Sequence, residues 1–67
     1  MKAKIEKVKA MVEGYEFEHG VFVEVEEGSD EWELMYMTPR EDQAAECARL
    51  INEGYDIEAA ISDADLM

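Results

Sequence analysis

Residues 22–33 read FVEVEEGSDEWE, and the prediction of the fold starts from this stretch. Apolar and acidic residues alternate on both sides of Gly28-Ser29, as expected of two strands that each turn one face to solvent. Glycine takes the positive φ at the first position of a type II′ turn without steric cost, so Gly28-Ser29 is predicted to be a two-residue turn. The stretch therefore predicts an antiparallel β-hairpin.

The predicted turn also determines which residues face each other across the two strands. One face of the hairpin is then apolar and the other is acidic. The predicted pairs are Val25–Trp32 and Val23–Leu34 on the apolar face, and Glu26–Glu31 and Glu24–Glu33 on the acidic face. Two carboxylates about 5 Å apart repel by roughly 1 kcal/mol in water, so lysine would serve a merely solvated face better.

A further strand is predicted in front of this hairpin, which gives strands at residues 15–18, 21–25 and 31–37. A three-residue turn, Glu18-His19-Gly20, with Gly20 in the left-handed conformation, places Glu16 on the acidic face. That face is the candidate partner-binding site. The candidate residues are Glu16, Glu24, Glu26, Asp30, Glu31 and Glu33, with Phe22, Met35 and Met37 at the other end of the same face.

The segment before the sheet has the apolar spacing of a helix. Ile5, Val8 and Val12 recur at helical intervals, and lysines occupy the remaining faces. A glycine is the usual residue just after a helix end, so the prediction is a helix from about residue 3 to Gly14.

After the sheet, MTPRED at residues 37–42 is typical of a helix start. Thr38 is the predicted N-cap, Pro39 follows it, and Glu41 completes a capping box. The predicted buried stripe is Ala44, Cys47, Ala48 and Ile51 with Leu50 alongside, Gly54 ends this helix, and Asp56 caps a last helix carrying Ile57, Ala60, Ile61 and Ala64. The fold class is therefore α+β, a three-stranded antiparallel meander packed on helices in the order α-β-β-β-α-α.

Length and charge limit the function. The chain has 67 residues, a formal net charge of −12 and a sequence pI of about 4.2, which predicts one small acidic domain over residues 1–67. Such a charge excludes a generic phosphate-binding surface, so direct nucleic-acid binding is not expected. We find no membrane-spanning run and no signal peptide, and the single cysteine fits a reducing compartment, so a cytoplasmic protein is expected.

The sequence contains no recognisable catalytic or metal-binding motif. The one histidine, His19, falls in a predicted turn, and Cys47 is predicted to be a small core residue. Neither EEGSDE nor SDAD has the ligand spacing of an EF-hand. The sequence therefore predicts a non-enzymatic protein without cofactor or metal.

In size, acidity and lack of an enzyme motif, the chain resembles the small phage-encoded inhibitors of host defence, particularly anti-CRISPR proteins and other DNA mimics. The resemblance implies an inhibitor, active in the host cytoplasm, that is a monomer or weak dimer. Its partner would be a basic nucleic-acid-binding protein such as a Cas complex, whose nucleic-acid groove the acidic surface would fill.

The acidic helix face around Asp42, Glu46 and Glu53 could make the contact in place of the sheet face. Two alternatives to the inhibitor function also remain open from the sequence. The chain could be an acidic adaptor or regulatory module that does not compete with nucleic acid. The acidity could also reflect selection for solubility or for a high-salt cytoplasm, although Lys2, Lys4, Lys7 and Lys9 argue against a halophile.

Overall fold

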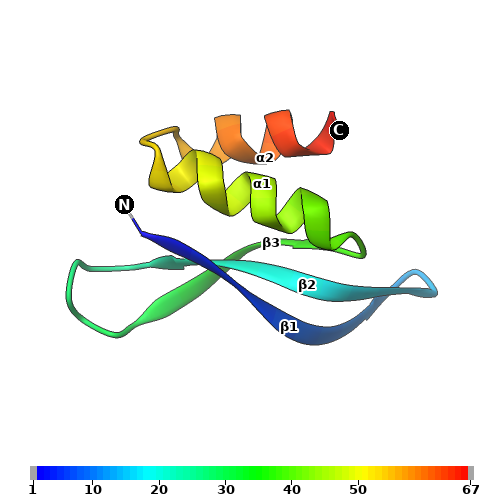
Figure 1. The fold of residues 1–67 in the computed structure, drawn as a ribbon. Coiled ribbons are helices and arrows are strands. Elements are labelled where there is room, and N and C mark those ends of the chain that lie inside the picture. The colour runs from blue at the N-terminus through cyan, green and yellow to red at the C-terminus, as the bar shows by residue number, and fades with distance from the viewer. Residues whose placement is uncertain (1, 67) are drawn as a thin grey trace.

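The structure, a computed structural model that describes residues 2–66, consists of a three-stranded antiparallel sheet and two helices. The elements in chain order are β1 (Ala3–Val12), β2 (Tyr15–Glu24), β3 (Trp32–Thr38), α1 (Glu41–Asn52) and α2 (Ile57–Asp65). Both helices lie on the same side of the sheet, which leaves its other face uncovered (Figure 1). The α+β class stands, but the predicted order α-β-β-β-α-α is wrong because the order is β-β-β-α-α.

The predicted N-terminal helix is strand β1, an edge strand paired with β2. The helical spacing was misleading because β1 contains a β-bulge. Lys7 pairs with His19 but Ala10 pairs with Phe17, so Val8 and Lys9 together face one residue of β2. The extra residue interrupts the two-residue period of the strand, and the apolar residues before and after it then imitate a helical spacing.

The turn between β1 and β2 is Glu13-Gly14, where the sequence predicted the end of a helix. Val12 pairs with Tyr15, and φ is 51° at Glu13 and 84° at Gly14, both positive as a type I′ turn requires. The predicted turn at Glu18-His19-Gly20 is also wrong. These residues lie inside β2, and Gly20 is an ordinary strand residue there.

The β2–β3 connection is longer than the predicted two-residue turn. The last pair of the ladder is Glu24 with Trp32, so residues 25–31 form a loop. Val23 then pairs with Glu33 and Phe22 with Leu34, one residue out of the predicted register. None of the predicted glutamate pairs forms across this ladder, and the longer loop avoids the repulsion that those pairs would cause.

A second bulge, at Met35, restores the predicted register farther along the ladder. Phe22 pairs with Leu34 and Val21 with Tyr36, so Met35 has no partner on β2. Because a shift of one residue moves side chains to the opposite face, Trp32 and Leu34 lie on the uncovered face instead of the core face. Met35, which was predicted on the acidic face, packs against the core together with Tyr36.

The helices follow the sequence prediction more closely. All five residues of the predicted α1 stripe are buried, as are Ala60 and Ala64 of α2, and Gly54 has a φ of 107° after α1. Helix α1 packs on all three strands and on α2. The core residues are Val21, Val23, Ala44, Cys47, Ala48, Leu50, Ile51, Ala60 and Ala64.

The start of α1 differs from the predicted cap. The N-cap is Arg40, and Thr38 is the last residue of β3, only 2% exposed. The Thr38 hydroxyl accepts a hydrogen bond from the Arg40 backbone N–H at 3.2 Å and donates one to Gln43 Oε1 at 2.6 Å. Thr38 therefore ties the end of the sheet to the start of the helix, and its side-chain partner is Gln43 instead of Glu41.

Candidate partner-binding surfaces

Residues 25–31, which we call the acidic loop, lie at the end of the sheet and extend beyond the helices (Figure 1). Two left-handed residues shape the loop, Gly28 with a φ of 80° and Asp30 with a φ of 61°, and both residue types tolerate that conformation. The Ser29 backbone N–H and hydroxyl both donate to the Glu26 carbonyl, at 3.0 and 2.7 Å. Val25 N–H donates to the Glu31 carbonyl at 2.9 Å and closes the loop.

The acidic loop and the strand ends beside it carry no positive charge of their own. Between residues 24 and 33 there are six acidic residues and no lysine or arginine. The ion pairs of the described residues lie elsewhere: Lys4 pairs with Glu6, Arg40 with Asp42, and Arg49 with both Glu46 and Glu53. Arg40 also lowers the pKa of the Asp42 carboxyl, mainly by hydrogen bonding to it. The helix carboxylates are thus partly neutralised within the chain.

The predicted acidic face is divided among four places. Glu26, Asp30 and Glu31 lie together in the acidic loop. Glu24, at the end of β2, accepts a hydrogen bond from Gly28 N–H at 2.5 Å, so its carboxylate holds the loop in shape. Glu33 pairs with Val23 and therefore lies on the helix side of the sheet, and Glu16 pairs with Met11 at the far end of β2. Glu16 lies eight positions before Glu24 along β2, which corresponds to a distance of about 26 Å in an extended strand.

Two features of this region were not predicted from the sequence. Glu27 belongs to the acidic loop and is exposed, and its neighbours in the sequence were sufficient to include it. Trp32 and Leu34 lie on the uncovered face because of the β3 bulge, for which the sequence gives no local signal, whereas Phe22 and Met37 lie there as predicted.

We call the part of the uncovered face where β1, β2 and β3 all pair the outer face; Glu16 and Glu18 lie on the same side of β2 but beyond the end of β3. The outer face consists of residues on alternate positions of the three strands. By the pairing of the strands these are Lys4, Glu6, Val8, Gly20, Phe22, Glu24, Trp32, Leu34 and Met37. Gly20 lies beneath this layer: a Cβ there would approach Leu34 Cδ1 to 2.9 Å and Val8 Cγ1 to 3.0 Å. The Lys4 ammonium lies 4.4 Å from the centre of the Trp32 ring, a cation–π contact.

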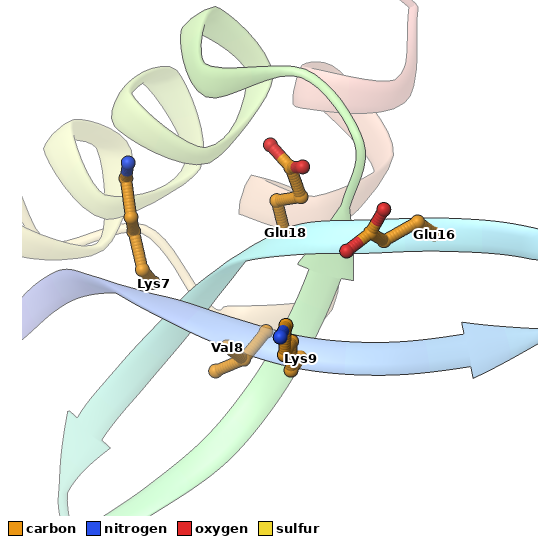
Figure 2. Close-up of a pocket in the computed structure, with 5 residues that line it drawn as sticks. All are labelled: Lys7, Val8, Lys9, Glu16 and Glu18. Carbon is orange, nitrogen blue, oxygen red and sulfur yellow. The ribbon is translucent and has the colours of Figure 1, made fainter.

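A hollow of about 370 Å³ lies beside the β1 bulge and is lined by Lys7, Val8, Lys9, Glu16 and Glu18. Figure 2 shows that these side chains come from the two neighbouring strands. Two lysines and two glutamates give the hollow no net charge. It therefore has no electrostatic preference for either an anion or a cation.

Among residues 2–66, no three histidine, cysteine, aspartate or glutamate side chains are placed to hold a metal ion together. Cys47 is fully buried, and burial raises the pKa of its thiol. Tyr36 donates a hydrogen bond to Asp65 Oδ1 at 2.5 Å. The pKa of Tyr36 is raised to about 12, mainly by its partial burial and secondly by this hydrogen bond.

In the part of the chain that the structure describes, neither helix is long and apolar enough to cross a bilayer.

Comparison with known proteins returned no family model, no curated protein and no solved structure that matches this chain.

Proposed function

We propose that the chain is a non-enzymatic inhibitor that binds a basic nucleic-acid-binding protein through the acidic loop. A CRISPR–Cas effector complex is the partner type that its small size and acidity suggest. The observation that carries the proposal is the concentration of six acidic residues between positions 24 and 33 with no basic residue among them. Carboxylates of the loop would then occupy lysines and arginines that otherwise bind phosphates.

The loop suits this role better than the helices do. The loop extends from the end of the sheet (Figure 1) and its acidic residues are exposed, whereas Asp42, Glu46 and Glu53 are already paired with arginines. The internal hydrogen bonds at Glu26, Ser29 and Gly28 hold the loop in one shape. A preorganised loop loses less conformational entropy when it binds.

A competition assay tests the proposal. An effector complex is mixed with labelled target DNA and increasing amounts of the chain, at low and at high salt. The chain is expected to displace the DNA, and less effectively at high salt, because screening weakens the attraction between the loop and a basic groove. A ternary complex with unimpaired DNA binding would instead identify an adaptor and rule out competition.

Charge reversal locates the contact. Replacing Glu26, Glu27 and Glu31 by lysine is expected to abolish displacement, while Asp30 is kept because its φ of 61° suits aspartate. Replacing Asp42, Glu46 and Glu53 by lysine changes the net charge equally and is the matched control. If both variants lose activity to the same degree while circular dichroism shows both folded, net charge and not the loop determines binding.

A further inference from the structure

The outer face combines large apolar side chains with a location that neither helix covers and that stays open among residues 2–66 (Figure 1). Phe22 and Leu34 form a cross-strand pair, and Trp32 and Met37 lie on the same face of β3. Leu34 is 40% exposed. Antiparallel sheets with one solvated face usually carry polar residues there, so an apolar outer face indicates a surface that becomes covered.

The charges of the outer face are few and already have partners within the chain. Lys4 pairs with Glu6 at 3.3 Å, and Glu24 accepts the Gly28 N–H. The net charge of the three is −1, from one lysine and two glutamates, against −12 for the whole chain. Covering this face would therefore bury one ion pair and one carboxylate that is already hydrogen-bonded, and no ionic group that lacks both kinds of partner.

We propose that a second copy of the chain covers the outer face, so that two sheets pack face to face in a symmetric dimer. A surface built for a basic partner would offer free carboxylates, whereas both glutamates here are engaged. A nearly neutral apolar face is instead complementary to itself, as a two-fold interface requires. Sheets packed in this way lie about 10 Å apart, which separates the helix layers of the two copies widely.

The area of the face sets the strength of the dimer. Three strands about 4.8 Å apart and seven residues long, at about 3.3 Å per residue, cover a projected area of about 330 Å². Stable interfaces bury about 800 Å² of each partner. The face is smaller than such an interface, so the dimer is expected to be weak and reversible.

This inference does not depend on the proposed function, because the two involve different surfaces and respond oppositely to salt. Each copy has a net charge of −12, so salt screens the repulsion between copies and strengthens the dimer. Binding of the acidic loop to a basic partner weakens with salt. The failure of either proposal thus leaves the other intact.

Sedimentation equilibrium of the unmodified chain, from micromolar to millimolar concentration, is the test. The apparent mass is expected to rise toward that of a dimer, and to do so at lower concentration when salt is added. Trp32 is the sole tryptophan of the chain, so its fluorescence emission should shift to shorter wavelength over the same range. A monomer at every concentration with constant Trp32 emission would overturn the proposal, as would association that salt weakens.

Two substitutions on the outer face, each made alone, sharpen the test. Leu34→Lys and Met37→Lys are each expected to weaken association at least about tenfold, the effect of a substantial interface contact. Leu66→Lys is the matched control, because Leu66 is 85% exposed and lies at the end of α2, away from the outer face. Circular dichroism checks the fold of each variant. Association that persists in folded Leu34→Lys and Met37→Lys, or is lost equally in Leu66→Lys, would overturn the proposal.

Discussion

The two faces of the sheet differ in both residue size and burial. On the helix side, Val21 and Val23 are 0% and 3% exposed beneath α1, whose buried residues are largely small. On the outer face the larger Phe22, Trp32 and Leu34 remain partly or well exposed. Folding of one copy thus depends on modest side chains packed closely, while Phe22 of β2 and Trp32 of β3 stay on the outer face. The helix side therefore supplies the stability of one copy, and the outer face is the surface through which we propose that two copies associate.

The sharpest test of this division is to shorten one apolar side chain on each face. Ile51 is fully buried between the helices and the sheet, so Ile51→Ala is expected to cost about 2–5 kcal/mol of unfolding free energy. Leu34→Ala on the outer face should cost about 1 kcal/mol or less, because much of that side chain is already in water. Urea denaturation at low protein concentration measures both.

The low concentration matters because it keeps the chain monomeric and so separates folding from association. Small domains have about 5 kcal/mol of stability, and Ile51→Ala should therefore leave the chain partly unfolded. Equal losses for the two variants would mean that the outer face is part of the folding core, and the contrast between the faces would not hold.

Tyr36 tests the helix side through pH. The raised Tyr36 pKa, about 12 in the folded chain against 10.0 for an ordinary tyrosine, means that folding favours the protonated phenol. The associated stability is fully present below pH 10 and is lost as pH rises from 10 toward 12, because the unfolded chain loses its proton first. Denaturation midpoints measured across this range should fall.

Tyr36→Phe removes the hydrogen bond to Asp65 and serves as the control for this pH dependence. The variant should lose about 1 kcal/mol at neutral pH and show a smaller decline above pH 10. Tyr15→Phe changes a tyrosine that is 71% exposed on β2, and it should keep the original pH profile. An unchanged profile in Tyr36→Phe would mean that other groups cause the alkaline loss.

The sequence was most informative where structure depends on neighbours in the chain. The α1 stripe, Gly54 and the N-cap position of Asp56 are short-range signals, and each lies where predicted. Strand β1 was mispredicted because its bulge at Val8 and Lys9 depends on pairing with β2. Its turn glycine, Gly14, fits a helix end and a hairpin equally well.

The candidate site could likewise be predicted only where its residues are close together in the sequence. Glu26, Asp30 and Glu31 meet in the acidic loop because they are close in sequence. Placing Glu16 and Glu33 with them required the correct register, which the long loop and the bulge at Met35 alter. Since a bulge gains its stability from packing on the other elements, no local pattern shows where it occurs.

The smallest expected effect is at the edge of the sheet, where the helix layer meets β1. Asn52 of α1 accepts a hydrogen bond from Ala3 N–H at 2.8 Å and donates one to the Ala3 carbonyl at 3.1 Å, as a neighbouring strand would. Because both bonds are exposed to solvent, Asn52→Ala should cost only a few tenths of a kcal/mol up to about 1 kcal/mol. Hydrogen exchange at the Ala3 amide should accelerate, while the Val21 amide in the central strand is unaffected.

The matched control is Glu53→Ala, at the next position of the chain, which removes an exposed ion pair with Arg49 and leaves both hydrogen bonds between Asn52 and Ala3 in place. Unchanged exchange at Ala3 in Asn52→Ala would show that the side chain does not protect the strand edge.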